Sequence, residues 1–112
     1  MTTIFGKIVR REIPADIVYE DELCLAFRDI NPQAPVHVLV IPKQEIDMLS
    51  SAKGGDQALL GHMVLAAVKI ARQLGVEDAF RLVVNNGAEA GQSVFHLHLH
   101  ILAGRKLRWP PG

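Results

Sequence analysis

The stretch His96–Leu102 reads HLHLHIL, and its pattern decides how the rest of the chain is interpreted. Polar and apolar residues alternate strictly, which is the period of a β-strand with one buried face. Such a strand directs His96, His98 and His100 to one face and the aliphatic residues between them to the other. Three imidazoles that titrate near neutral pH on one face favour a chemical role over ordinary solvation.

Metal binding is one chemistry that such a row of imidazoles can perform. Residues two apart on a strand are separated by about 6.6 Å, so the outer histidines lie about 13 Å apart. Two imidazoles on one zinc ion must bring their nitrogens within about 4.2 Å. No Asp or Glu lies between Gly91 and Gly112 to complete a site. A metalloprotein using two of the strand histidines therefore stays the weaker alternative, and no metal or cofactor is predicted.

Phosphoryl transfer fits the row better. A neutral imidazole attacks phosphorus readily and leaves again readily, which divides one difficult step into two easier ones. His98 has a histidine on each side and is the predicted nucleophile, with His96 and His100 as donors to oxygens or to the leaving group. Attack requires the neutral ring, so turnover should fall at acid pH.

The loop of residues 85–93 leads directly into this strand and contains two glycines. Such loops can direct successive backbone N–H groups toward an anion. Gln92 and Ser93 add side-chain donors, so we predict that the loop and the histidines bind one phosphate.

Three further residues are interpreted from their positions. His37 faces the same way as Leu39, and a hydrogen-bonded core residue and a supporting role beside the other histidines stay equally open. His62 falls on the polar side of a long helix and is predicted to be solvated. Cys24, the only cysteine, is predicted to be a buried apolar residue rather than a reactive thiol, and it excludes an intrachain disulfide.

The composition is that of a globular protein. The 112 residues are 49% hydrophobic and 21% charged, which predicts a single domain over 1–112. Twelve basic and twelve acidic side chains cancel, so neither nucleic acid nor a membrane is an expected partner. No signal peptide and no run of about 18 apolar residues is found, and a cytoplasmic location is expected.

Periodicity and turn residues predict an α+β fold, with an antiparallel sheet and helices packed on it. The expected elements are a short helix capped by Thr3, strands at 17–19, 23–27, 36–41, 80–84 and 94–102, and one long helix capped by Asp56 and ended by Gly75. The apolar stripe of the long helix is expected at Leu60, Met63, Val64, Ala67, Val68, Ala71 and Leu74.

With these motifs in hand, the chain resembles the histidine triad (HIT) family, and more narrowly its Hint branch of nucleotide-binding proteins. His96–Leu102 matches the family signature of three histidines separated by hydrophobic residues. The branch is indicated by Cys24–Phe27, Asp29–Ile30, Pro32–Pro35, His37, Ile41–Lys43, Val83–Asn85, Gly91–Ser93 and Trp109–Gly112.

The resemblance implies a HIT-like fold, with a five-stranded antiparallel sheet, one long and one short helix, and a homodimer in which the two sheets are continuous. It implies a metal-independent hydrolase, a purine nucleoside phosphoramidase acting on substrates such as adenosine 5′-monophosphoramidate through a nucleotidylated histidine. The alternative is a regulatory module that binds purine nucleotides with little turnover. In either case the expected ligand is a purine nucleoside monophosphate or phosphoramidate.

The resemblance also implies roles for single residues. His98 would be the nucleophile, His100, His96 and Ser93 would surround the phosphate, and His37 would support them. Asp29 would hold the ribose hydroxyls, and Asn85 would contact the phosphate or ribose. Gly91 and Gln92 belong to the phosphate loop, and Trp109 would reach the leaving group in the partner subunit. The apolar slot for the purine would consist of Ile4, Phe5, Ile8, Phe27, Ile30 and Leu39.

Overall fold

The computed structural model describes residues 3–112, and its centre is a five-stranded antiparallel sheet in the order β1-β2-β3-β5-β4. The strands are β1 (Ile17–Glu20), β2 (Cys24–Arg28), β3 (Val36–Pro42), β4 (Phe80–Val83) and β5 (Leu99–Ala103). The helices are α1 (Ile4–Val9) and α2 (Gln57–Gln73), and residues 3–112 also contain three short 3-10 turns. The predicted α+β class and sheet are confirmed.

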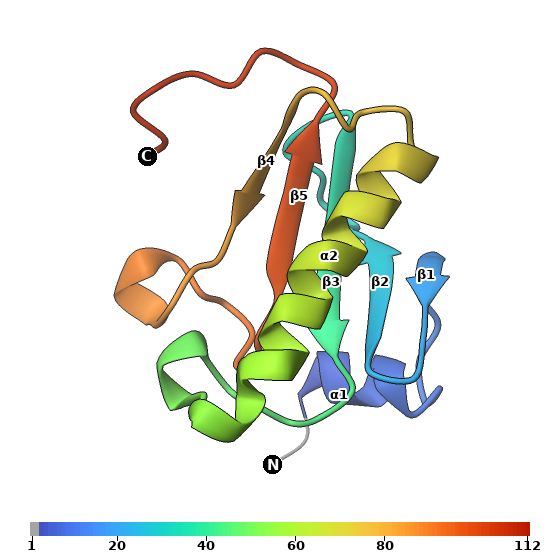
Figure 1. Cartoon of the computed structure of the whole chain (residues 1–112), viewed down its shortest axis with the longest axis vertical. Coiled ribbons are helices and arrows are strands. Elements are labelled where there is room, and N and C mark those ends of the chain that lie inside the picture. Colours follow the sequence, from blue (N-terminus) through green and yellow to red (C-terminus); the bar gives the residue numbers. More distant parts are fainter. Residues whose placement is uncertain (1–2) are drawn as a thin grey trace.

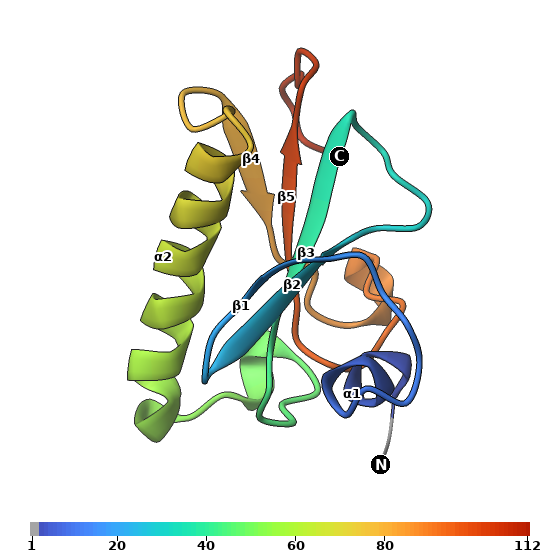
Figure 2. The same cartoon turned by 90° about the vertical axis from the view of Figure 1, so that its right-hand side faces the viewer.

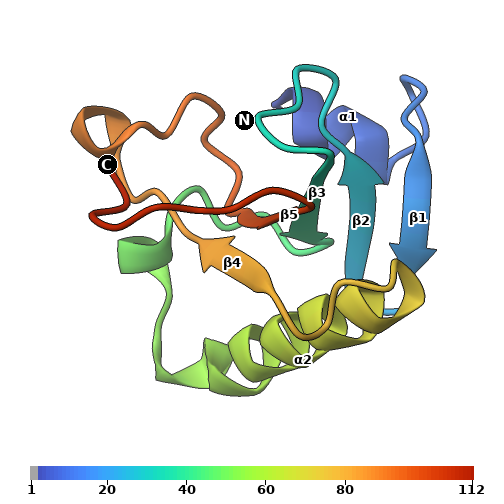
Figure 3. The same ribbon diagram turned by 90° about the horizontal axis from the view of Figure 1, so that it is seen from above.

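The two helices lie on opposite faces of this sheet (Figures 1 and 2). Seen from above, α1 and the loop before β5 lie on one side and α2 on the other (Figure 3). Leu97, Leu99 and Ile101 belong to the core that α2 covers, whereas the ring of Phe5 in α1 lies against His98. The alternation of the HLHLHIL stretch therefore separates its two sets of side chains as predicted.

The fifth strand begins at Leu99, so the predicted start at Val94 is wrong. Val40 pairs with Leu99 in the β3–β5 register, which puts Leu97 opposite Pro42. Proline has no N–H and ends the ladder. The N–H of Leu97 instead donates to the carbonyl of Ile46 at 2.7 Å. His96 and His98 therefore lie in an irregular segment that leads into the strand.

The ends of the helices follow their local chemistry. The hydroxyl of Thr3 accepts a hydrogen bond from the N–H of Gly6 at 3.1 Å and caps α1 as predicted. Gly75, with φ of 73°, follows the end of α2. The prediction for Asp56 is wrong, because its carboxylate accepts from the N–H of Lys53 and makes no cap bond to α2.

The buried stripe of α2 differs from the predicted one. Val64 is 44% exposed, and Leu60, Val68 and Leu74 are only partly buried. The face of α2 that packs on the sheet is rotated by about one residue from the predicted face, and Ile70 lies in it. The buried residues are Leu59, Met63, Ala66, Ala67, Ile70 and Ala71. Within residues 3–112, no helix combines the length and apolarity needed to cross a bilayer.

Candidate active site

Two histidines from different strands form the centre of the site. His37 lies opposite Leu102 in the β3–β5 register, which makes it the diagonal neighbour of His100 on the same face. Nε2 of His37 and Nδ1 of His100 are 2.9 Å apart. His37 is therefore buried and hydrogen-bonded, and it also lies beside His100, so its supporting role stays a prediction.

A backbone amide fixes the tautomers of this pair. The N–H of Gln33 donates to Nδ1 of His37 at 3.0 Å, so in the neutral ring the proton of His37 lies on Nε2. That proton is donated to Nδ1 of His100, which leaves the proton of His100 on Nε2. This Nε2 is buried and has no hydrogen-bond partner among residues 3–112. The pair therefore presents one oriented N–H donor that no protein acceptor uses.

His98 carries its proton on the opposite nitrogen. Its Nδ1 lies 2.8 Å from the carbonyl oxygen of His96, and a carbonyl can only accept. Nε2 of the neutral ring consequently keeps its lone pair, which is the form a nucleophile requires. The rings of His98 and His100 are 4.9 Å apart between centroids, and Phe5 packs edge-on against His98 at 5.0 Å.

His96 is the most enclosed of the three histidines. Nε2 donates to the carbonyl of Pro42 at 2.8 Å, and the side chain is buried. This bond ties the segment before β5 to the end of β3. The observed role of His96 is thus to hold the backbone whose carbonyl orients His98, while its predicted contact with phosphate stays a prediction.

Asp29 is the carboxylate nearest to this group. The backbone N–H of Asp29 donates to the carbonyl of His37, continuing the β2–β3 pairing by one residue. Its Oδ2 then lies 3.4 Å from Nε2 of His37, and Oδ1 accepts from the N–H of Asn31 at 2.9 Å. The sequence argument considered carboxylates only near the three histidines in the chain, whereas the fold brings Asp29 to them from the residue after β2.

Burial keeps these imidazoles neutral. It lowers the pKa of His98 and of His37, in the latter against the opposing effect of Asp29. Burial together with the neighbouring His98 and His37 lowers the pKa of His100 to about 4. At neutral pH His37, His98 and His100 are therefore neutral, and His98 offers a lone pair while His100 offers an N–H.

The loop before β5 is held by Gln92, whose side chain points inward. Its Oε1 accepts from the N–H of Gly87 at 2.8 Å, and Nε2 donates to the carbonyls of Asp47 and Val94. The side-chain N–H groups of Gln92, predicted to donate to a phosphate, are therefore used to hold the loop in place. Gly91 adopts φ of 99°, a conformation that favours glycine.

Asn85 and Ser93, both predicted to contact the ligand, are the first and last residues of this loop. The side chain of Asn85 lies against Gly91, because a Cβ there would be 3.6 Å from its Nδ2. Ser93 is exposed. Both residues belong to the loop that leads to the histidines, and their contact with phosphate stays a prediction.

The six residues predicted for the purine slot separate into two groups. Four of them are buried together on the α1 side of the sheet: Phe5, Ile8, Phe27 and Leu39. Ile4 is 51% exposed and Ile30 is 98% exposed. Within the buried group, Phe5 packs against both Phe27 and His98. Contact of any of the six with a purine stays a prediction.

The C-terminal segment lies outside this group of residues. Trp109 is 81% exposed, and its ring packs under the guanidinium of Arg81 at 5.9 Å. Arg81 also donates to the carbonyl of Arg108 at 2.9 Å. The tail is therefore fastened to β4 and not to the histidines of its own chain.

A cavity of about 850 Å³ is lined by His96 and Phe95 together with residues of the segment that follows β3. Among the residues predicted for the site, His96 alone lines it. The ligand atoms of Asp29, His37 and His100 lie within 4.8 Å of one another and form the set nearest the site that could hold a metal ion. Such an ion would occupy the two nitrogens that now face each other.

Three contacts of the site were missed by the sequence: the backbone N–H of Gln33, the carbonyl of Pro42, and the approach of Asp29 to His37. Two of them involve main-chain groups, which carry no residue-specific signal. The third depends on the β2–β3 register.

Comparison with known proteins identifies the family. The model of the HIT domain matches residues 10–107, and the chain belongs to this family. Among curated proteins, it is 68% identical over 110 residues to an uncharacterized HIT-like protein of Synechocystis, covering 98% of this chain and 96% of that one. It is 50% identical over 112 residues to the 14 kDa zinc-binding protein of Zea mays, covering 98% and 88%.

Solved structures agree with this assignment. The fold matches a HIT family hydrolase from Legionella pneumophila with a TM-score of 0.97 and 46% identity, covering 99% of this chain and all of the other. It also matches the histidine triad nucleotide-binding protein from Candida albicans with a TM-score of 0.84 and 29% identity, covering 97% and 83%.

Proposed function

We propose that this protein is a purine nucleoside phosphoramidase that cleaves the P–N bond of substrates such as adenosine 5′-monophosphoramidate. The observation that carries the proposal is the opposite tautomers of two adjacent rings. His98 keeps a free lone pair on Nε2, and His100 offers an unused N–H on its Nε2. A phosphorus centre needs both, a nucleophile for the atom itself and a donor for its oxygens.

In the first step, Nε2 of His98 attacks phosphorus and the P–N bond to the amine breaks. The departing amine takes up one proton from solvent, which the attacking water of the second step returns, and the nucleotide stays on His98 through a new P–N bond. The N–H of His100 donates to a non-bridging oxygen as charge develops there. The carbonyl of His96 stabilises the positive charge that His98 acquires, since it already accepts from Nδ1.

In the second step, water attacks the same phosphorus and the bond to His98 breaks. The products are the nucleoside monophosphate and a neutral His98, with one water consumed for each amine released. Asp29 would accept hydrogen bonds from the ribose hydroxyls, and Ser93 and Asn85 would bind the phosphate. The hydrolase and nucleotide-binding names of the similar structures support this class of reaction.

We further propose a homodimer formed through β4, which lies at the edge of the sheet (Figure 1). Pairing of two β4 strands would make the sheets continuous. The opposite edge, β1, has an irregular register and is less suited to pairing. In such a dimer the tail fastened to β4 would lie near the partner, which supports the role of Trp109 in trans.

The test is turnover of a fluorogenic adenosine phosphoramidate in EDTA by wild type and His98→Ala. We expect amine release by the wild type, reduced at least about 10³-fold in the variant because the nucleophile is gone. Full activity in His98→Ala would overturn the proposal. Tight nucleotide binding without turnover in either protein would favour the regulatory binding module. The chelator separates hydrolysis from the zinc binding that the name of the maize relative describes.

A further inference from the structure

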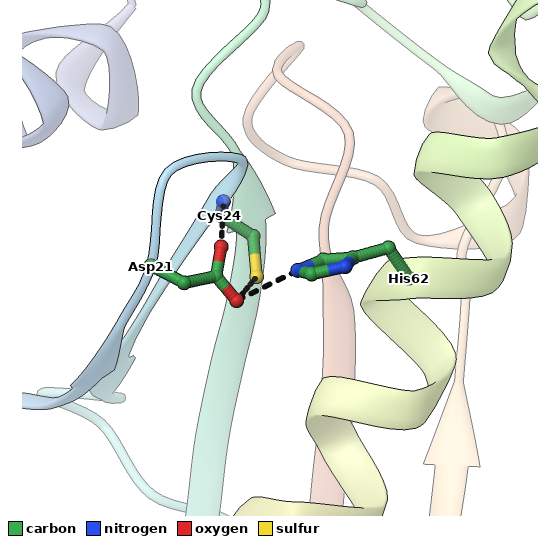
Figure 4. A group of neighbouring side chains, drawn as sticks. All are labelled: Asp21, Cys24 and His62. Carbon is green, nitrogen blue, oxygen red and sulfur yellow. Dashed lines mark hydrogen bonds and ion pairs between the residues drawn. The ribbon is translucent and has the colours of Figure 1, made fainter.

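Asp21, Cys24 and His62 form a second cluster of chemically active side chains, on the sheet face that α2 covers. Asp21 lies in the turn between β1 and β2, Cys24 begins β2, and His62 projects from α2 toward them (Figure 4). Oδ2 of Asp21 is 2.6 Å from Nε2 of His62 and 3.6 Å from Sγ of Cys24. The predicted solvation of His62 is therefore wrong, and none of the three takes part in the mechanism above.

The ligand types in this cluster are those of a zinc site. A thiolate, an imidazole and a carboxylate all bind zinc, whereas a sulfur ligand disfavours magnesium and calcium. Bound to Zn²⁺, an ionised Cys24 and an ionised Asp21 with a neutral His62 give a site of zero net charge. Zero net charge suits this position, because Cys24 is fully buried in the core under α2.

The distances are close to those of a tetrahedral ion. Ligand atoms around zinc are separated by about 3.3–3.8 Å, given bonds of about 2.0–2.3 Å. The three atoms here all lie within 4.8 Å of one another, and the sulfur–oxygen distance of 3.6 Å already fits. The oxygen–nitrogen distance of 2.6 Å must widen by about 0.7 Å, which a side-chain rotation of the 35% exposed His62 can provide.

The carboxylate of Asp21 is held in place by hydrogen bonds to both of its oxygens, and Oδ2 is the oxygen that faces Cys24 and His62. Oδ1 of Asp21 accepts from the N–H groups of Leu23 at 2.8 Å and Cys24 at 2.9 Å. The hydroxyl of Tyr19 donates to Oδ2 at 2.8 Å. Such bonds to a ligating carboxylate are the outer contacts that orient metal ligands. Asp21 and His62 are 24% and 35% exposed, which gives the ion an entry path.

We propose that Asp21, Cys24 and His62 bind one zinc ion, with a water molecule as the fourth ligand. On binding, the thiol releases its proton to solvent and the proton of a neutral His62 moves from Nε2 to Nδ1. The S–H and imidazole hydrogen bonds to Asp21 are replaced by bonds to zinc, and nothing is oxidised or reduced. Without zinc, burial and the Asp21 charge raise the pKa of Cys24 to about 12, so the metal-free thiol is protonated. The bound ion would join the β1–β2 hairpin to α2.

The test is titration of the untagged full-length protein with Co²⁺ and then with Zn²⁺ as competitor. Cys24 is the only thiol in the chain, so a thiolate-to-cobalt charge-transfer band can come from this cluster alone. We expect the band to appear at one equivalent, to disappear on adding Zn²⁺, and to be absent in Cys24→Ala. A rise in the midpoint of thermal unfolding with Zn²⁺ should accompany it.

Matched histidine variants separate this cluster from the histidines around His98. His62→Gln replaces a partly exposed side chain and should fold, yet weaken cobalt binding with the thiolate band by at least about tenfold. His37→Gln removes a candidate ligand of the other cluster and should leave the band unchanged. Absence of the band in the wild type, or equal affinity in wild type and His62→Gln, would overturn the proposal.

Discussion

At the scale of single residues, the site depends on which nitrogen of each ring carries the proton. The carbonyl of His96 and the N–H of Gln33 are opposite kinds of group, and each fixes one ring. Because Gln33 acts on His100 through His37, the neighbouring rings of His98 and His100 carry their protons on opposite nitrogens. The position of the proton is set by the backbone groups around each ring and not by the residue type.

The pH dependence of turnover tests the neutral state of His98. Because burial lowers the pKa of His98 below its ordinary 6.5, the ring stays neutral and reactive to lower pH than a free imidazole. We expect kcat/KM for an adenosine phosphoramidate to be constant near neutrality and to fall on acidification with a midpoint below 6.5. A profile without an acid limb, or a midpoint above that value, would contradict the assignment.

Replacing His37 tests the relay to His100. His37→Phe keeps a flat ring in the same space but removes the donor to Nδ1 of His100, so the His100 proton is no longer confined to Nε2. We expect kcat to fall by about 10- to 100-fold, the usual effect of losing an orienting contact. Nitrogen NMR of the His100 ring should show mixed tautomers. Unchanged kcat with a single tautomer would refute the relay.

At the scale of elements, β3, β5 and the loop before β5 bring the site together. The HLHLHIL alternation correctly predicts which side chains lie on each face of the sheet. Pro42 ends the β3–β5 pairing, however, so the strand begins only at Leu99. The irregular segment that results allows His98 to bond to the carbonyl two residues before it, a contact that a regular strand does not make. Loss of regular pairing here is thus what orients His98, the proposed nucleophile.

The inward side chain of Gln92 predicts a matched pair of variants. Gln92→Ala removes three hydrogen bonds of a buried side chain and leaves the N–H of Gly87 without its acceptor. We expect a loss of about 1–3 kcal/mol in the free energy of unfolding and a higher KM. Ser93→Ala, at the exposed neighbouring position, should leave stability unchanged. Denaturant unfolding of both variants measures this, and equal stabilities would contradict the role of Gln92.

At the scale of the whole molecule, burying neutral histidines couples stability to pH. The pKa of His100 is about 4 in the folded chain and 6.5 in its ordinary state, so the unfolded chain binds more protons between these values. The stability contributed by His100 is therefore present above pH 6.5 and is lost as the pH falls toward 4. Chemical unfolding at a series of pH values should show this decline. In a His100→Asn variant the free energy of unfolding should decline less as the pH falls. A decline equal to that of the wild type would exclude His100 as its cause.

The proposed dimer predicts a mass and a tail effect. Light scattering should give twice the 12.3 kDa of one chain. A chain truncated before Trp109 should keep its affinity for AMP but change its relative rates with different amine leaving groups, because the tail would reach the partner's leaving group. A monomeric mass, or equal changes in affinity and leaving-group preference, would contradict this arrangement.

The sequence predicted the sheet, the two helices and the face of the histidines, because alternation and turn residues are local signals. It did not predict the pairing of His37 with His100 or of His62 with Asp21. These pairs are separated by 63 and 41 residues, and they form only in a particular register and packing. The buried stripe of α2 was predicted wrongly for the same reason: Val64 is apolar, but the packing of the helix on the sheet leaves it exposed.

The central claim is that His98 carries the nucleotide during turnover. Rapid quenching of the protein with an adenosine phosphoramidate, followed by intact-mass measurement and peptide mapping, tests it most directly. We predict a transient increase by one adenylyl group, located on His98 and absent in His98→Ala. Turnover with no adduct, or an adduct on another residue, would contradict the account.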